Sequence, residues 1–400
     1  MNPPTGSLVG ERMALDVGPV AHGGHWVARA ADGRVVFVRH ALSGERVLAE
    51  VTEEHPGYLR ADALELLSGP AAERVAPPCR FAGFPGELAG PRGGTCGGCD
   101  FQHVAPEHQR ELKAAVVREQ LTRLARLTPA EVEDLGVRVA ELPGSVSGWR
   151  SRLRYTVDAA GRAGLHAFRS HEVVPVDRCL IAHPALQALP VTAEEWPDDD
   201  EVAVIASSGG DVTVVEPGTT VRERAVGRLW TIPAGVFWQV HPAAPDAFAD
   251  AVLDLLDPRP TDRAWDLYGG VGLFAAALSP RVASVVLVES DAGAARAARS
   301  CLADLSNVHI VRSTVERFRF SDAPDIVVLD PPRSGAGSRV VREIAAAAPR
   351  AIAYVACDPA AFARDLATLR SLGWRLSALR CFDAFPMTHH VELIALLQPS

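Results

Sequence analysis

Hydrophobic and polar positions follow two different periods along the chain. Over residues 8–67, short alternating runs are broken by Gly-Gly, Asp-Gly and Ser-Gly pairs, which is typical of β-strands joined by tight turns. From residue 237 onward, apolar segments of strand length alternate with helical segments, a pattern that favours a parallel, doubly wound sheet. The region between them is mixed, with a helical stretch at 106–127 and strand-like segments at 153–157 and 202–205.

These patterns divide the chain into three predicted domains. Residues 1–70 are expected to form an OB-like β-barrel of about five strands, residues 71–229 a central α+β domain, and residues 230–400 an α/β domain. Strands of the last domain are expected at 264–268, 284–289, 308–312, 325–330, 351–357, 374–382 and 390–397.

The last two of these strands are joined by a turn that is too short for a crossover helix. The final strand must therefore run antiparallel to its neighbour. A sheet of seven strands with this ending indicates a class I S-adenosylmethionine-dependent methyltransferase. A dinucleotide-binding domain would instead have a sheet of six strands.

Composition narrows the class of protein. With 48% hydrophobic and 22% charged residues, the 400-residue chain is expected to be globular, soluble and monomeric. No stretch approaches the roughly 20 apolar residues of a membrane span, and the N-terminus lacks a signal-peptide layout, so we expect a cytoplasmic protein without a membrane partner. A net charge of −9 gives no general attraction to nucleic acid. Any such contact would depend on local clusters such as Arg150, Arg152 and Arg154, which could equally be solvated strand positions.

The first predicted strand of the α/β domain ends in a glycine turn at residues 266–272. Glycines there let the backbone approach a ligand. Glu289 ends the second strand 17 residues after Gly272, where a carboxylate can accept both hydroxyls of a ribose. This pair fits S-adenosylmethionine, NAD or FAD, although Glu289 could instead cap a helix.

Asp330 ends the fourth strand and is followed by Pro331 and Pro332. The prolines fix a rigid turn that presents Asp330 at the carboxyl edge of the sheet. Enzymes that methylate exocyclic amines place an aromatic residue after such a turn, whereas this chain has Arg333. The sequence therefore disfavours amine methylation.

Cys357 ends the fifth strand at the start of a helix, where helix N–H groups are expected to lower the thiol pKa. A cysteine there could also be a small apolar residue that closes a core strand. Glu392 opens the apolar last strand, where burial would raise its pKa, or it could be an edge solubiliser. Together the two residues suit methylation of uracil carbon 5, which needs a thiolate that adds to carbon 6 and a base that removes the carbon 5 proton. His389 and His390 are expected to orient the loop that leads to Glu392 rather than to catalyse.

Five segments resemble the ordered motifs of the RNA 5-methyluridine methyltransferases: residues 237–241, 266–272, 330–333, 357–359 and 385–392. The N-terminal region is similar to the RNA-binding TRAM domain, so the resemblance covers nearly the whole chain. It implies RNA as the partner and uridine carbon 5 as the methylated atom, with ribosomal RNA favoured over transfer RNA.

The resemblance also implies roles for single residues. Cys357 is implied as the nucleophile, Glu392 as the proton acceptor, and Phe237 as a neighbour of the flipped uracil, which must leave any base stack. The residues implied to contact S-adenosylmethionine are Gln239, Tyr268, Glu289 and Asp330.

Three positions depart from the family pattern. His241 stands where the family usually has Asn, so the positioning done by that amide must be done by an imidazole or lost. Gly269 replaces a common Cys in the glycine turn, and Ser43 replaces Pro in a turn of the barrel.

Seven cysteines in a chain of this length indicate reduced thiols with catalytic or metal duties. Cys79, Cys96, Cys99 and Cys179 supply four thiolates, which by spacing fit either structural zinc or an iron–sulfur cluster. Resemblance to the family's Cys-Gly-Gly-Cys segment implies a 4Fe-4S cluster. The 16 residues between Cys79 and Cys96 exceed the family's usual spacing, and the Gly- and Pro-rich stretch 84–94 is expected to loop out.

Two rival functions follow from the same residues. One is methylation of another substrate, such as DNA cytosine or a small molecule. The DNA enzymes usually place Pro before the catalytic Cys, whereas Ala356 stands here. The other rival is a non-catalytic iron–sulfur RNA-binding protein, which the intact Cys357, Glu392 and cofactor acids disfavour.

Overall fold

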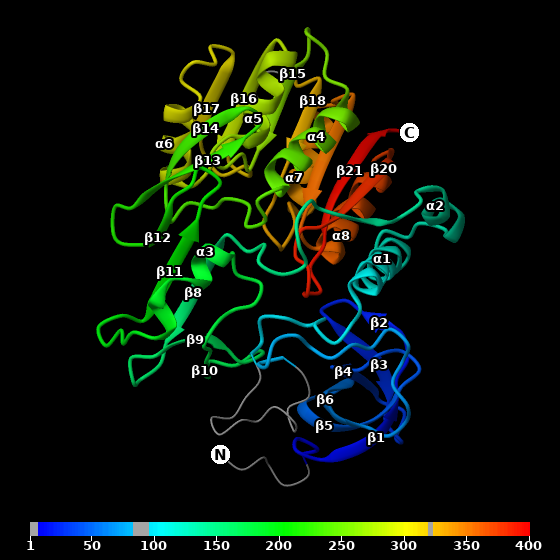
Figure 1. Cartoon of the computed structure of the whole chain (residues 1–400). Helices are drawn as coiled ribbons and strands as arrows, with labels where there is room; N and C mark the ends of the chain where they lie inside the picture. The colour runs from blue at the N-terminus through cyan, green and yellow to red at the C-terminus, as the bar shows by residue number, and fades with distance from the viewer. Residues whose placement is uncertain (1–6, 83–95, 319–322) are drawn as a thin grey trace.

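The computed structural model describes residues 7–82, 96–318 and 323–400 and contains three sheet-bearing parts (Figure 1). The predicted loop at 84–94 lies outside the described residues. The first part is a six-stranded sheet with strand order β1-β5-β6-β4-β3-β2, one strand more than the approximate prediction because β2 is a short pair of residues. Its bounds are β1 Arg12–Asp16, β2 Val20–Ala21, β3 His25–Arg29, β4 Val35–Arg39, β5 Arg46–His55 and β6 Tyr58–Leu66.

The second part is a five-stranded antiparallel sheet with order β10-β9-β8-β11-β12, followed by the β13–β14 hairpin. It has its own core, in which Trp149, Leu153 and Tyr155 are buried. The elements are β8 Arg152–Val157, β9 Ala163–His166, β10 Val173–Pro175, α3 Pro184–Gln187, η1 Pro190–Thr192, β11 Glu201–Ala206, β12 Val212–Val214, β13 Thr220–Ala225 and β14 Arg228–Pro233.

The third part is an eight-stranded sheet with order β17-β16-β15-β18-β19-β21-β20-β7. All seven predicted strands are present, and β21 runs antiparallel to both β19 and β20, as the short final turn required. The strands are β15 Arg263–Leu267, β16 Ser284–Glu289, β17 Val308–Arg312, β18 Ile326–Leu329, β19 Ala351–Ala356, β20 Trp374–Asp383 and β21 Glu392–Pro399. The eighth strand, β7 (Val139–Glu141), comes from the middle of the chain and pairs in parallel with β20. Its three residues are too few to give a periodic pattern, so the prediction of seven strands was one short.

Helices cover both faces of this sheet, as expected for a doubly wound fold. One apolar cluster includes residues of α4, α5 and α6, and a second, on the other face, includes residues of α1, α7 and α8. The helices are α1 Pro106–Arg123, α2 Pro129–Asp134, α4 Ala244–Leu256, α5 Leu273–Leu278, η2 Ser279–Arg281, α6 Ala292–Cys301, α7 Gly337–Ala346 and α8 Pro359–Ser371. Two segments from the middle of the sequence, α1 and β7, therefore pack on the C-terminal sheet.

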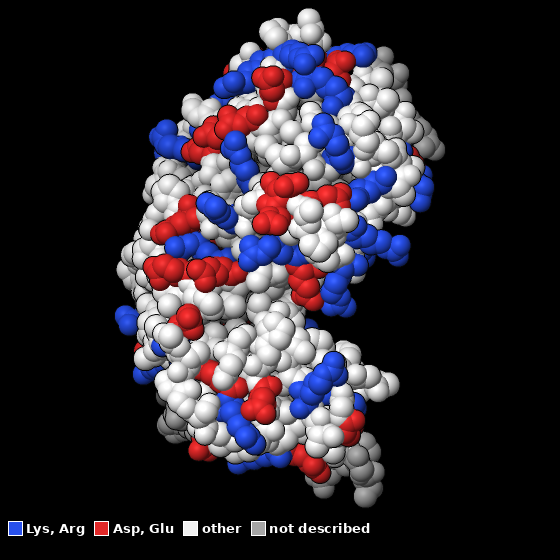
Figure 2. Space-filling view, turned by 90° about the vertical axis from the view of Figure 1, so that its right-hand side faces the viewer, with Lys and Arg blue, Asp and Glu red and all other residues white. Residues whose placement is uncertain are grey.

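The strand order reverses between β15 and β18, and ligands of doubly wound sheets bind at the carboxyl edge beside such a point. Within the described residues, no helix is long and apolar enough to span a membrane. On the face seen in Figure 2, acidic and basic side chains are interspersed without a large area of one sign, in keeping with the modest net charge of −9.

Candidate active site

A cavity of about 780 Å³ lies at the carboxyl edge of the eight-stranded sheet. The sequence analysis singled out six residues for catalysis or cofactor binding, and the structure brings all six to this cavity. They are Gln239, Tyr268, Glu289, Asp330, Cys357 and Glu392. Cys357 and Glu392 therefore share one cavity, which is the first requirement of the predicted chemistry.

The sheet itself brings these two residues together. Because β21 is antiparallel to β19, the start of β21 lies at the edge where β19 ends. In the observed register Ala356 pairs with Leu393, so the adjoining residues Cys357 and Glu392 lie side by side. The antiparallel last strand is thus what delivers a carboxylate to the cysteine.

The thiol pKa differs from the sequence-based expectation. Burial, reinforced by the negative charges of Glu392 and Asp330, raises the pKa of Cys357 to about 12. The expected lowering by the helix N-terminus is wrong, because Cys357 precedes the helix and the Asp358 side chain caps α8 by accepting the Ala361 N–H at 2.7 Å. Arg333 is the positively charged residue that opposes this increase.

The carboxylates of the cavity are also perturbed. Burial, with a contribution from Asp330, raises the pKa of Glu392 well above its usual range, while Arg333 acts in the opposite direction. Burial raises the pKa of Asp330 to about 7. The pKa of Asp266, one strand away, is also raised to about 7 by burial. Its Oδ2 accepts the Ala275 N–H at 2.8 Å.

The glycine turn after β15 is held by Glu289. The Glu289 carboxylate accepts the backbone N–H of Gly270 at 2.9 Å and that of Asp291 at 2.5 Å. Asp291, rather than Glu289, caps helix α6. Tyr268 has a φ of +61°, a left-handed conformation that costs energy in a residue with a side chain. This strained turn places Tyr268 and Glu289 on the cavity wall.

The loop after Asp330 is fixed by a buried acid. Asp365 Oδ2 accepts hydrogen bonds from the Tyr354 hydroxyl at 2.7 Å and from the Ala336 N–H at 2.8 Å. At the other end of this loop, Arg333 Nη2 lies 3.4 Å from His390 Nε2. Arg333 lines the same cavity as Cys357 and Glu392.

Phe237 and Gln239 lie on the loop between β14 and α4, and the Phe237 side chain is 70% exposed on the cavity wall. Arg152 supports this loop, because its guanidinium donates to the carbonyls of Ala234 and Val236, each at 3.1 Å. Arg152 is also paired with Glu223 at 2.7 Å. Arg152 therefore has a structural role in this loop.

His241 accepts a hydrogen bond of a kind that an asparagine side chain could also accept. Its Nδ1 accepts the Ala243 N–H at 3.2 Å at the start of α4, and its ring stacks on Trp149 with an interplanar angle of 19°. Burial lowers the pKa of His241 to about 4, so the ring is neutral and can accept this bond. The imidazole therefore holds the start of α4 through this hydrogen bond.

Comparisons with known proteins find similarities along most of the chain. A TRAM domain model matches residues 6–64, and a model described as tRNA (Uracil-5-)-methyltransferase matches residues 234–399. The chain is 31% identical to the 23S rRNA (uracil(1939)-C(5))-methyltransferase RlmD of Thiobacillus denitrificans, over 96% of this chain and 99% of that one.

The chain belongs to the RNA (uracil-5-)-methyltransferase family.

Two further similarities extend over almost the full length. An uncharacterised RNA methyltransferase from Streptomyces avermitilis is 45% identical over 98% of this chain and 99% of its own. The crystal structure of the Pyrococcus abyssi tRNA (uracil-54, C5)-methyltransferase in complex with S-adenosyl-L-homocysteine superimposes with a TM-score of 0.70 at 20% identity, and covers 96% of this chain and 99% of that one. The second similarity shows that the chain has the same fold as the Pyrococcus abyssi enzyme.

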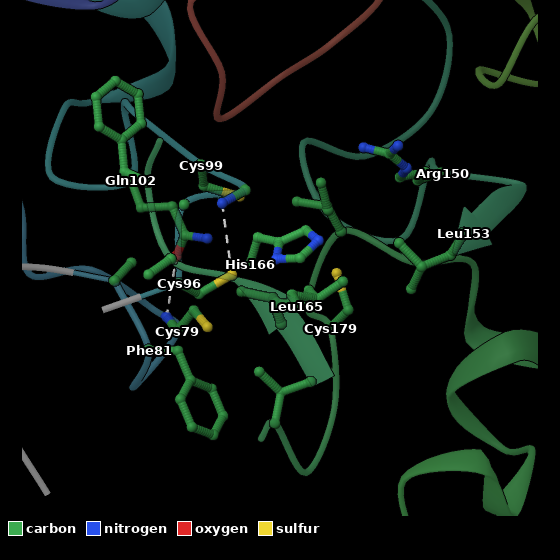
Figure 3. A pocket seen from close by; sticks show the side chains of 18 of the residues that line it. Cys79, Phe81, Cys96, Cys99, Gln102, Arg150, Leu153, Leu165, His166 and Cys179 are labelled. Carbon is green, nitrogen blue, oxygen red and sulfur yellow. Dashed lines mark hydrogen bonds between the residues drawn. The ribbon is translucent and has the colours of Figure 1, made fainter. Parts of the chain in front are cut away.

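The four predicted metal-binding cysteines of the methyltransferase line a second cavity of about 600 Å³. Figure 3 shows Cys79, Cys96 and Cys99 on one side and Cys179 across from them. Two hydrogen bonds shape the first side: Gly98 N–H donates to Cys96 Sγ at 3.4 Å, and Cys79 N–H donates to the Gln102 side chain at 3.1 Å. Residues far apart in sequence thus surround one cavity with four sulfur atoms.

The sequence allows two metal groups at these four cysteines, a zinc ion and an iron–sulfur cluster. Among residues 7–82, 96–318 and 323–400, no group of three or more His, Cys, Asp or Glu side chains is arranged to hold a single metal ion. A zinc ion needs four sulfurs about 2.3 Å from one point. Four thiols around one cavity supply donor atoms that suit either group.

The two cavities adjoin, which the sequence did not predict. Gly97, Gly98 and Arg150 line both of them. Arg150 is thus the member of the predicted arginine cluster that faces the active site, whereas Arg154 pairs with Glu201 on the surface. The separation of these segments in the sequence gave no signal for this proximity.

Sequence analysis also missed how the loop at residues 384–391 is anchored to helix α1. Lys113 Nζ donates to Asp383 Oδ1 at 2.6 Å, and both side chains are at most 2% exposed. Gln109 Oε1 accepts the Met387 N–H at 2.9 Å. Because this loop leads into Glu392, these buried contacts define where the carboxylate sits.

Proposed function

We propose that the methyltransferase transfers a methyl group to carbon 5 of a uridine in RNA through a covalent bond between Cys357 Sγ and uracil carbon 6. The observation that carries this proposal is the pairing of Cys357 and Glu392 at one sheet edge, inside a cavity lined by four candidate cofactor residues. Neither a structural cysteine nor an edge solubiliser would need the other residue beside it.

The chemistry follows from the weak nucleophilicity of uracil carbon 5. After the Cys357 thiol loses its proton, the thiolate adds to carbon 6 and the electron pair of the double bond makes carbon 5 nucleophilic. S-adenosylmethionine supplies the methyl group from its sulfonium. The Glu392 carboxylate then removes the proton from carbon 5, the double bond re-forms, and the carbon–sulfur bond breaks to release the Cys357 thiolate. The pKa of Cys357 is high, so its thiolate needs a nearby positive charge. Arg333 supplies that charge and lowers the thiol pKa.

The cofactor has matching residues in the cavity. Glu289 ends β16, where its carboxylate can accept the ribose hydroxyls, and Asp330 directly follows β18 and has a raised pKa. Tyr268 and Gln239 supply an aromatic ring and an amide on the same wall. The exposed Phe237 ring offers a stacking surface for a flipped uracil, since a base inside a stack could not reach Cys357.

We further propose ribosomal RNA as the substrate. The support is the similarity over 96% of the chain to a 23S rRNA (uracil(1939)-C(5))-methyltransferase, together with an N-terminal TRAM domain. The test is to map 5-methyluridine in ribosomal and transfer RNA from cells with and without the gene. Loss of one 5-methyluridine from ribosomal RNA is expected. Loss confined to transfer RNA would refute the choice of substrate, and an unchanged pattern in both would refute the function.

The four-cysteine cavity is proposed to hold a 4Fe-4S cluster bound by Cys79, Cys96, Cys99 and Cys179. Support comes from the chemistry of four thiols around one cavity of about 600 Å³. Its role would be to fold the second domain beside the active site, since methyl transfer passes no electrons. Iron and acid-labile sulfide should each be found at about four per chain in protein purified without oxygen. Stoichiometric zinc without iron would contradict the cluster.

A further inference from the structure

The turn between β2 and β3 of the N-terminal sheet reaches the helix that follows the proposed nucleophile. His22 Nε2 lies 3.1 Å from Asp358 Oδ2. Asp358 is the residue after Cys357 and caps α8. A side chain of the first domain, His22, therefore contacts the residue that adjoins Cys357 in the third domain.

The same turn also packs on the loop that leads to the proposed base. A Cβ atom added at Gly24 would lie 3.0 Å from Asp100 Cβ and 3.2 Å from His389 Cβ, so the turn backbone is in direct contact with both. Asp100 Oδ2 accepts hydrogen bonds from the His389 backbone N–H at 3.2 Å and from His389 Nδ1 at 2.6 Å. The Asp100 side chain is only 7% exposed.

The Asp100–His389 contact fixes a segment of the active-site wall. His389 lies between Thr388 and His390, which both line the cavity. Beside it, the Phe101 N–H donates to the Met387 carbonyl at 3.0 Å. The loop that precedes Glu392 is therefore held from outside by residues that never touch the cavity.

We propose that the β2–β3 turn positions the catalytic centre: His22 orients Asp358 beside the nucleophile, and Gly24 seats Asp100 against His389 in the loop before the base. This inference rests on the proposed function, because it takes Cys357 as the nucleophile. It adds to the RNA-binding role expected of a TRAM domain, since the turn acts on the protein's own catalytic loops. His22 and Asp100 are positioning residues.

The expected effect is on turnover rather than on folding. The His22 side chain is 36% exposed, and partly exposed ion pairs add little to stability. A small displacement of catalytic groups, in contrast, can cost about 100-fold in rate. Loss of the turn contact should therefore lower kcat while RNA affinity is retained.

Two glycines of the N-terminal domain offer a matched pair of variants in the full-length protein. Gly24 and Gly33 have φ values of +76° and +87°, so an alanine is strained at either position, but a Cβ at Gly33 would have no neighbour within 4 Å. Gly24→Ala should lower kcat about 10- to 100-fold with KM for RNA unchanged within about twofold. It should also speed hydrogen exchange of the amides at 387–389. Gly33→Ala should change neither quantity.

Two further variants separate positioning from general damage. His22→Ala should lower kcat about 5- to 50-fold without a change in KM. Asp100→Ala should behave as Gly24→Ala does, whereas Asp100→Asn, which keeps an oxygen acceptor for His389, should recover most of the rate.

The inference is overturned if Gly24→Ala leaves the exchange at 387–389 unchanged, if it lowers kcat no more than Gly33→Ala, or if it acts through KM alone. Exchange is measured without substrate and so tests the inference whatever the product is. Absence of 5-methyluridine in the wild-type reaction would contradict the proposed function instead.

Discussion

Replacement of Glu392 by Gln isolates the proton-removal step. Glu392 is 5% exposed, and burial, with a contribution from Asp330, raises its pKa well above its usual range, so its charged form is disfavoured in the folded protein. A neutral amide of the same shape should therefore change the free energy of unfolding by no more than about 2 kcal/mol. General-base catalysis contributes about 10²- to 10⁴-fold, or about 3 to 5 kcal/mol of barrier. Turnover of Glu392→Gln should fall by that factor while addition of Cys357 to the base continues.

The slowed step makes the covalent intermediate visible. With labelled substrate RNA and cofactor, Glu392→Gln should accumulate an RNA–protein adduct on denaturing gels, approaching one RNA per chain. The double variant Cys357→Ala/Glu392→Gln is the control and should form none. If Glu392→Gln binds RNA normally but forms no adduct, or turns over at the wild-type rate, the proton is removed by another group and the assignment of Glu392 is refuted.

Three further outcomes follow from the buried charges. The alkylation rate of Cys357 should rise about tenfold per pH unit up to pH 10, because its pKa is about 12. Glu392→Gln should lower that pKa, because it removes a neighbouring negative charge; no change between the variants would contradict the electrostatic coupling. The folded pKa of Asp266, about 7, lies above its unfolded value of 3.8, so its contribution to stability is present below pH 4 and is lost as pH rises to about 7. The fall in Tm between pH 5 and 8 should therefore be smaller in Asp266→Asn, and an equal fall would argue against a raised pKa. Lys113→Met should cost about 3 to 5 kcal/mol in urea unfolding, because it leaves Asp383 buried without its partner at 2.6 Å, whereas a loss below 1 kcal/mol would show that the pair is dispensable.

The sequence predicted the parts of the site that are fixed by strand ends. Glu289 ends a strand, Asp330 and Cys357 directly follow strands, and the carboxyl ends of parallel strands meet at one edge, so their proximity follows from the fold. Glu392 joins them because an antiparallel strand starts where its neighbour ends. These are local patterns combined with one topological rule.

What the sequence could not predict depends on contacts between distant segments. The Asp100–His389 hydrogen bond joins residues 289 positions apart, and β7 is too short to leave a periodic signal. The expected sign of the Cys357 pKa shift was wrong because burial and two nearby carboxylates outweigh a helix N-terminus that Asp358 already caps. Burial and charge are properties of the assembled cavity, so a local reading of the helix start missed them.

The most direct test of the central claim follows the hydrogen on carbon 5. Substrate RNA made with tritium at carbon 5 of uridine is incubated with S-adenosylmethionine and the wild-type protein or Cys357→Ala. The account predicts release of one tritium to water for each methyl group transferred by the wild type, and neither release nor transfer by Cys357→Ala. Methyl transfer without tritium release, or transfer that persists in Cys357→Ala, would contradict it.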